Sequence, residues 1–389
     1  MWLFGSGLFL VAYLGINIYT GVRVLSLIRF FLPSFKAFIF WPVYFLFCYS
    51  FVFFSLLQFA WARPLRLAGM SSIPAVFYFF LALLLLDGLR IFLQHFGRIP
   101  YTKIYSTAGT GIAICLALIT MIYGVYNARN IRTVNYTITL NKRAETSHLR
   151  IALVSDLHIG ETVGQKWIAN IVDAVNKTEP DIICIAGDII DSSLERISDI
   201  EAVASELKRL SAPLGVYACP GNHDVDRLSL RQAGGTGSGM EGIKAFLEKA
   251  NIVFLLDEIV MPEDNIYLAG RKDARPIGLR QARESAAELI ADLDKSKLLI
   301  VLDHQPVDYS NLEKAGADLI FSGHTHRGQF FPGNVATRLI YRRAGATHYG
   351  YWRGAAAQAV VSSGAGLWGP PIRVATGSEV AVIDVVFGE

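Results

Sequence analysis

Four long apolar stretches without a charged residue lie in the first part of the chain. They cover residues 1–22, 37–62, 67–86 and 104–128. A helix needs about 20 apolar residues to cross ~30 Å of hydrocarbon, and each stretch is near or above that length. The pattern therefore predicts four transmembrane helices.

The pattern changes at about residue 130, where short apolar runs begin to alternate with charged amphipathic segments. Strands are predicted at 134–140, 149–154, 181–186, 215–219, 253–256, 266–269, 298–302, 319–321, 359–362 and 380–387. Helices are predicted at 167–176, 197–210, 241–250 and 279–293. Such alternation is typical of an α/β layer structure. We expect a transmembrane region at 1–128, a linker at 129–147 and a globular domain at 148–389.

The composition favours a membrane protein. The 389 residues are 52% hydrophobic and 18% charged, with a mean hydropathy of +0.38, which is more apolar than an ordinary soluble enzyme. A signal peptide is the alternative for the first stretch, but it lacks a basic segment and a small-residue cleavage site. Buried helices of a soluble all-α domain are the alternative for the other three. Their length and the aromatic residues near their ends favour the bilayer.

The charge gives no support for nucleic-acid binding, and the cysteines do not indicate a cellular compartment. The net charge is +3, and no basic stripe with stacking aromatic residues supports nucleic-acid binding. The four cysteines are scattered in apolar contexts without a Cys-x-x-Cys pair, so they report no redox compartment.

The basic residues between the spans bear on orientation. An even number of spans puts the N-terminus and the polar domain on the same side of the membrane. Five or six basic residues then lie on the opposite side and four on the side of the domain. By the positive-inside rule this excess favours a domain on the outer face of the cell (inner) membrane.

Polar side chains directly follow five of the predicted strands. They are Asp156 and His158, Asp188, Asn222 and His223, His304, and His324 and His326. Because the carboxyl ends of parallel strands share one edge of a sheet, these residues can converge on one crevice. A single such histidine is usually a core or surface residue, but five coincidences are far more specific. Imidazole, carboxylate and amide donors together suit Mn, Fe or Zn better than Ca or a structural zinc site.

The chain resembles the calcineurin-like metallophosphoesterases in an ordered set of motifs. These are Asp156-x-His158, Gly187-Asp188-x-x-Asp191, Gly221-Asn222-His223-Asp224, His304 and Gly323-His324-Thr325-His326. The resemblance covers residues 150–387, and the apolar stretches in front are similar to the membrane-attached branch of that superfamily. It implies a four-layer α/β/β/α sandwich.

The resemblance also implies two divalent metal ions, of Mn, Fe or Zn. One ion would be held by Asp156, His158, Asp188 and His326, and the second by Asp188, Asn222, His304 and His324. The carboxylate of Asp188 would bridge the two. Such a pair of ions lowers the pKa of water and clamps the phosphoryl oxygens during in-line attack.

Two further residues complete the expected catalytic group. His223 follows a ligand directly, so we expect it to give a proton to the leaving-group oxygen, and we expect Asp224 to orient its imidazole. Asp224 departs from the family, in which Glu is common there, and Arg327 stands where Gly is common. Arg327 is either a phosphate contact or, like most arginines, a solvated side chain. Asp191 is expected to be a hydrogen-bond partner of the ligands or a turn residue.

These observations predict a membrane-anchored phosphoesterase acting on a phosphomonoester, phosphodiester or pyrophosphate. Anchoring in the bilayer favours a lipid-linked or membrane-proximal substrate, and the resemblance makes a UDP-2,3-diacylglucosamine-like lipid precursor one candidate. The alternative is a catalytically silent membrane receptor or scaffold, against which the intact ligand set argues. A transporter is a third reading, but the spans lack charged residues at mid-bilayer.

Overall fold

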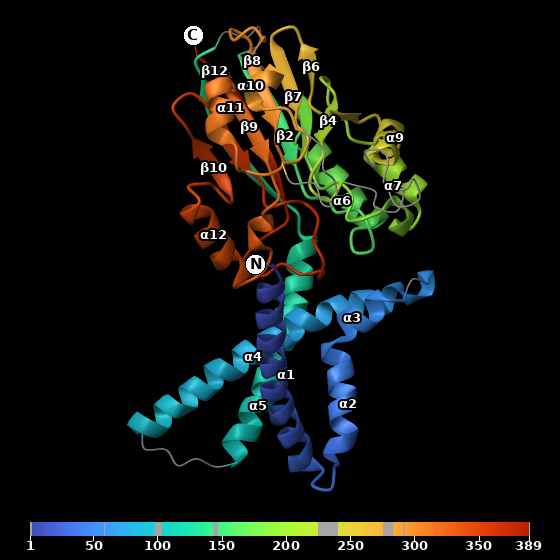
Figure 1. Cartoon of the computed structure of the whole chain (residues 1–389), viewed down its shortest axis with the longest axis vertical. Coiled ribbons are helices and arrows are strands. Elements are labelled where there is room, and N and C mark those ends of the chain that lie inside the picture. Colours follow the sequence, from blue (N-terminus) through green and yellow to red (C-terminus); the bar gives the residue numbers. More distant parts are fainter. Residues whose placement is uncertain are drawn as a thin grey trace. The chain divides into compact units, whose positions relative to one another are not determined.

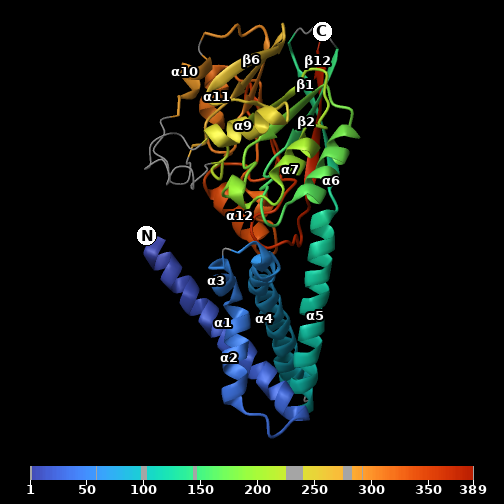
Figure 2. The ribbon, with the colours of Figure 1, turned by 90° about the vertical axis from the view of Figure 1, so that its right-hand side faces the viewer.

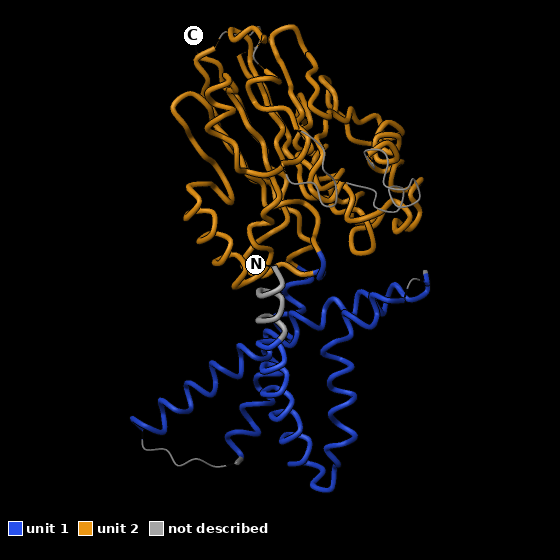
Figure 3. Tube along the Cα trace, in the orientation of Figure 1, with its two compact units in different colours: residues 1–126, 369–371 blue, residues 127–368, 372–389 orange. Residues whose placement is uncertain are grey.

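The structure is a computed structural model that describes residues 2–57, 59–97, 103–142, 147–224, 240–274, 283–290 and 292–388. It divides into two compact units (Figure 3). Unit 1 comprises residues 1–126 and 369–371, and unit 2 comprises residues 127–368 and 372–389.

Unit 1 is helical. Its elements are α1 (Trp2–Phe31), α2 (Ala37–Cys48), α3 (Ser50–Ser55), the 3-10 helix η1 (Ala60–Ala62), α4 (Arg63–Gly97) and most of α5 (Lys103–Arg129). Within the described ranges, three segments are long and apolar enough to cross a membrane, at Val11–Phe31, Arg63–Gly97 and Ile104–Arg129. Within this unit, α1 and α4 run in the opposite direction to α2 and α5 (Figures 1 and 2).

The second predicted span is not one helix, which corrects the expectation of four continuous transmembrane helices. α2 has 12 residues, and at 1.5 Å per residue it is about 18 Å long, short of ~30 Å of hydrocarbon. The helix breaks at Tyr49, where φ and ψ are −103° and 12°. The Tyr13 hydroxyl donates to the Cys48 carbonyl at 2.8 Å, and the Ser50 hydroxyl to the Phe47 carbonyl at 2.7 Å. These hydroxyl groups satisfy backbone carbonyls that lose their helical partners at the break. In apolar surroundings a helix is interrupted only where other groups satisfy its freed backbone.

Unit 2 contains two six-stranded mixed sheets. The first has the order β1 (Arg132–Leu140), β12 (Glu379–Phe387), β2 (His148–Val154), β3 (Ile182–Ala186), β4 (Val216–Cys219) and β5 (Val253–Phe254). The second has the order β10 (Gly350–Arg353), β11 (Gln358–Val361), β9 (Leu319–Ser322), β8 (Leu298–Leu302), β7 (Ile266–Gly270) and β6 (Glu258–Glu263). Strands β2 to β5 run parallel, and so do β7, β8, β9 and β11.

Three hydrophobic cores hold these layers together. The inner faces of the sheets meet in one core, to which Cys184 of β3 and Phe321 of β9 both belong. The outer face of the first sheet is covered by α6 (Gln165–Asn176), α7 (Ile200–Leu207) and α9 (Glu241–Lys249). That of the second is covered by α10 (Ala286–Ile290) and α11 (Tyr309–Ala315) (Figure 1). The predicted four-layer α/β/β/α sandwich is confirmed.

The segment expected to be a linker contributes an edge strand to the first sheet. β1 pairs along its whole length with β12, in parallel. Ile138 and Leu140 are buried and alternate with exposed residues. The apolar alternation at 134–140 predicted a strand there, but only its pairing makes it part of the sandwich.

The last turn of α5 belongs to unit 2. Asn127 is buried, and its amide nitrogen donates to the carbonyl oxygens of Arg373 at 2.9 Å and Thr376 at 2.7 Å. Its amide oxygen accepts a hydrogen bond from Arg132 at 2.6 Å. These bonds join the end of the helix to the segment that precedes β12.

We expect Asn127→Ala to lower the free energy of unfolding of unit 2 by about 1–3 kcal/mol, because two buried carbonyl groups lose their donor. Thermal unfolding of the full-length protein in detergent, followed by near-UV circular dichroism, measures this. Asn130→Ala, at an exposed position one turn later, is the matched control and should leave the transition unchanged. Equal transitions for the two variants would show that this junction does not stabilise unit 2.

Candidate metal centre

The polar residues that follow five strands meet where the carboxyl ends of the two sheets adjoin. Asp188 follows β3 of the first sheet, and its Oδ2 lies 3.1 Å from Nε2 of His304, which follows β8 of the second. Asp156 follows β2, and its Oδ1 lies 3.4 Å from Nε2 of His326, which follows β9. The convergence expected of parallel strand ends is therefore present, and it joins both sheets.

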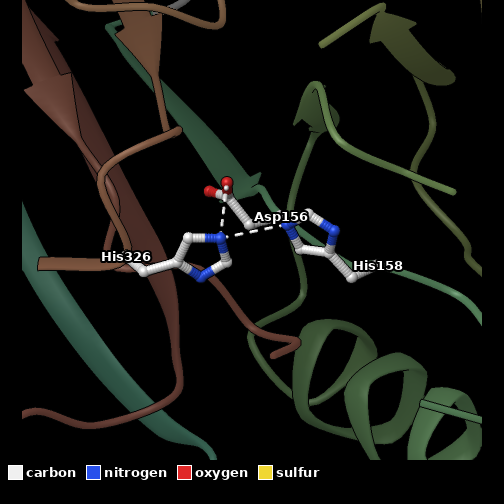
Figure 4. A group of neighbouring side chains, drawn as sticks. All are labelled: Asp156, His158 and His326. Atoms are coloured by element: carbon white, nitrogen blue, oxygen red, sulfur yellow. Dashed lines mark hydrogen bonds and ion pairs between the residues drawn. The ribbon is translucent and has the colours of Figure 1, made fainter. Parts of the chain in front are cut away.

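Asp156, His158 and His326 form the first group with metal-binding geometry (Figure 4). One ligand atom from each lies within 4.8 Å of the others. Nε2 of His158 and Nε2 of His326 are 3.0 Å apart. The three side chains point towards one another from two loops, those after β2 and β9, and all three are buried.

Asp188, His304 and His324 form the second group. Asp188 also faces the first group, because its Oδ2 lies 3.6 Å from Nε2 of His158. Its other oxygen, Oδ1, accepts a hydrogen bond from the backbone nitrogen of His223 at 2.8 Å. This bond holds the segment that contains Asn222 against Asp188.

Buried atoms without a hydrogen-bond partner test whether this site fits cations. Oδ1 of Asn222 is buried and has no such partner in the described chain. An unsatisfied buried acceptor is rare in a folded protein and needs an explanation. Imidazole nitrogens, carboxylates and one amide oxygen are donors that suit Mn, Fe or Zn. The residues present therefore fit two divalent ions.

The pKa values of the candidate ligands shift in both directions. Burial, followed by the charge of His304, lowers the pKa of His324 to about 3. Burial and the charge of His158 lower the pKa of His326 well below its usual value. Burial alone would raise the pKa of Asp188, but His304 and His158 hold it well below its usual range. Burial alone would lower the pKa of His304 and of His158, but the charge of Asp188 and, at His158, a hydrogen bond to Asp191 raise both. Because neutral imidazoles and ionised carboxylates are the forms that bind metal, metal binding would release protons from these two histidines.

The backbone at the site adopts the left-handed region at non-glycine residues. The φ angles are 53° at Asp156, 46° at His158, 52° at Asp188, 72° at His324 and 47° at His326. Such conformations cost about 1–3 kcal/mol each and gather at functional sites. The sequence carries no direct signal for them, because asparagine and glycine are the usual markers of this region.

Two glycines allow the carboxylates to approach the backbone. A Cβ atom at Gly221 would lie 2.2 Å from Oδ1 of Asp188, and one at Gly323 would lie 2.3 Å from Oδ2 of Asp156. Both distances are far below van der Waals contact. These positions therefore need glycine for space.

The structure changes the role expected for Asp224. Its carboxylate accepts hydrogen bonds from the backbone nitrogens of Ile189, Ile190 and Gly221 at 2.8–2.9 Å. Nδ1 of His223 instead lies 2.8 Å from the carbonyl oxygen of Asp191. A carbonyl oxygen only accepts, so Nδ1 carries the proton. Asp224 thus braces the loops around Asp188, and the backbone of Asp191 orients His223.

Arg327 and Arg271 are engaged with neighbours. The guanidinium of Arg327 stacks over the ring of Tyr349, 4.1 Å from its centroid. Arg271 is buried and pairs with Asp303 at 2.8 Å and Asp308 at 2.9 Å. Asp303 precedes His304, so this ion pair supports the loop that carries a candidate ligand.

Sequence reasoning missed Arg373. Its side chain is fully buried and donates to the carbonyl oxygens of His326 at 3.3 Å, Ser363 at 2.7 Å and Gly366 at 3.0 Å. It thereby fixes the backbone of a candidate ligand. No motif marks this arginine, which lies 47 residues after His326.

Comparisons with known proteins agree with this geometry. Residues 149–328 match the calcineurin-like phosphoesterase family. The chain is 31% identical over 236 residues to an uncharacterized metallophosphoesterase of Helicobacter pylori, covering 60% of this chain and 59% of that protein. It is 30% identical over 287 residues to the transmembrane protein with metallophosphoesterase domain of Danio rerio, covering 70% and 62%.

A more distant relative is the UDP-2,3-diacylglucosamine pyrophosphatase LpxG of Chlamydia trachomatis. The identity is 23% over 227 residues, covering 48% of this chain and 66% of that protein. The matched part of the chain spans about three fifths of the length of the first two relatives. Together with the convergent strand-end residues, these matches show that the chain carries a calcineurin-like metallophosphoesterase domain.

Proposed function

We propose that this chain is a membrane-anchored phosphoesterase that uses two divalent ions. The first is held by Asp156, His158, Asp188 and His326, and the second by Asp188, Asn222, His304 and His324. The position of Asp188 is the observation that carries the proposal. Its Oδ2 lies 3.6 Å from Nε2 of His158 in one group and 3.1 Å from Nε2 of His304 in the other, so this carboxylate would be able to serve both ions.

The ions, when bound, lower the pKa of water and neutralise phosphoryl oxygens. The residues of the chain supply the rest. His223 donates from Nδ1 to the Asp191 carbonyl, so Nε2 is the nitrogen that can give a proton to the leaving-group oxygen. The ring of Trp368, whose side chain is 56% exposed, lies edge-on to His223 at 6.4 Å, where it can contact the leaving group.

We propose a phosphomonoester, phosphodiester or pyrophosphate of a lipid-linked or membrane-proximal molecule as the substrate. Three helices of spanning length precede the domain in the described chain, which keeps it at a bilayer. The name of the Chlamydia trachomatis relative supports a UDP-2,3-diacylglucosamine-like lipid precursor as one candidate.

Asp188→Asn is expected to reduce metal content from about two ions per chain to less than one, because both sites lose a charged ligand. Elemental analysis of the full-length protein after incubation with Mn²⁺ and desalting measures this without an activity assay. Asp173→Asn, on the surface of α6 with a side chain 61% exposed, should keep the full content. Retention of both ions by Asp188→Asn would show that this carboxylate is not shared.

His223→Ala is expected to keep the metal content and to lower turnover about 10²–10⁴-fold, because the leaving group loses its proton donor. The loss should be larger for phenyl phosphate than for p-nitrophenyl phosphate, since the less acidic leaving group needs the proton more. His148→Ala, at a histidine with a side chain 45% exposed, is the control. Unchanged turnover would remove His223 from the mechanism. Full metal content with no turnover of either substrate, or of bis-p-nitrophenyl phosphate, by the unmodified protein would favour a silent receptor.

We further propose that α2 and α3 together return the chain across the bilayer, which keeps the number of crossings even. The excess of basic residues at the other end of the spans then favours a domain that faces outward. A C-terminal alkaline phosphatase fusion, which is active only outside the cytoplasm, is then expected to be active. A matched fluorescent-protein fusion that matures only inside should stay dark. The opposite pattern would place the domain in the cytoplasm and favour a nucleotide-linked lipid precursor.

A further inference from the structure

The charge of unit 2 is strongly segregated along the chain. Residues 319–378 contain six arginines and no aspartate, glutamate or lysine. The nearest acidic residues are Asp318 before and Glu379 after this stretch. Two of the arginines are engaged, since Arg373 is buried and Arg327 stacks on an aromatic ring. The others are exposed, and three of them lie on one helix.

That helix is α12 (Gly333–Arg343), which has no buried residue. Val335, Leu339 and Ile340 are 45%, 51% and 64% exposed. At 100° per residue, Val335 and Leu339 lie at the centre of the exposed face. The half-buried residues Asn334, Thr337 and Tyr341 lie on the opposite face.

Arg338, Arg342 and Arg343 border the apolar centre of the exposed face, on both sides. Long arginine side chains in this arrangement can extend their charge outward while the aliphatic part covers apolar surface. A helix with an apolar face bordered by arginines and without acidic residues has the composition of an interfacial membrane helix. Phe331, two residues before the helix and 42% exposed, adds to the apolar surface.

We propose that the exposed face of α12 binds the surface of a bilayer that contains anionic lipids. The positive charge matches anionic headgroups, each arginine near such a surface contributing roughly fivefold to binding. A second copy of this face is disfavoured as the occupant, because a symmetric contact would bring like charges together. The bilayer is also within reach, since β1 begins three residues after α5 ends.

α12 is attached closely to the candidate metal centre. The 3-10 helix η3 (His326–Gly328) begins with a candidate ligand and is followed by α12 after four residues. Gly328 packs against the start of α12, where an added Cβ would lie 2.4 Å from the backbone nitrogen of Asn334. A lipid contact of α12 would therefore hold the loop of His324 and His326 near the headgroups. This consequence rests on the proposed function, whereas the lipid contact itself does not.

Spin labels on the full-length protein in nanodiscs test the contact. Cys115 is the exposed cysteine and is replaced by serine, while Cys48, Cys184 and Cys219 are buried. A nitroxide at Leu339→Cys is expected to collide more with oxygen than with an aqueous nickel chelate when the disc contains phosphatidylglycerol. Access to the chelate should be several-fold lower than in detergent. A label at Met261→Cys in β6, where the native side chain is 45% exposed, should stay equally accessible to the chelate in both.

A separate variant tests whether the lipid contact requires the positive charge of the arginines. Replacing Arg338, Arg342 and Arg343 together by glutamine is expected to restore chelate access at position 339, with an unchanged near-UV circular dichroism spectrum. Phosphatidylcholine discs should give the same result with the arginines intact. Equal chelate access at positions 339 and 261 in phosphatidylglycerol discs would overturn the proposal. Spin-spin broadening between labelled copies would also overturn it, by showing a contact with a second chain. Because neither readout uses turnover, failure of this proposal is distinguishable from failure of the phosphoesterase assignment.

Discussion

The buried carboxylate of Asp188 is the constraint on which the rest of unit 2 depends. A charge without a partner is expensive to bury, and this one is paired across the molecule with His304. Asp188 follows a strand of the first sheet and His304 follows a strand of the second. The two sheets must therefore pack with their carboxyl ends aligned. The core that includes Cys184 and Phe321 supplies that packing.

The candidate metal centre also depends on an unusual backbone conformation at its ligands. Five of the candidate ligands occupy left-handed φ angles, which persist only where the surroundings determine them fully. Glycines at 221 and 323 let carboxylates approach the chain. Buried Asp224 and Arg373 hold the neighbouring loops through backbone groups. The site is thus built as much from main-chain contacts as from metal-binding side chains.

The last turn of α5, which lies in unit 2, is bonded to the same framework. The last turn of α5 is bonded through Asn127 to the carbonyl oxygen of Arg373, and the side chain of Arg373 bonds the carbonyl of His326. A short continuous path of hydrogen bonds therefore links the end of the anchor to a candidate ligand. α12 leaves the same ligand loop and carries the exposed arginines. Within unit 2, the last turn of α5 and α12 are thus both connected to the loop of His326.

The sequence by itself determined the class of fold, the apolar helices and the strand-end residues, because these depend on local periodicity and on motif spacing. All ten predicted strands occur, whereas β6 and β10, at the edges of the second sheet, were not foreseen. The tertiary structure alone decided where the second apolar stretch breaks, since the partner of the Cys48 carbonyl is Tyr13, 35 residues away. It also decided that the carbonyl of Asp191, and not Asp224, meets the ring of His223. Those outcomes depend on contacts between distant segments, which no local pattern in the chain records.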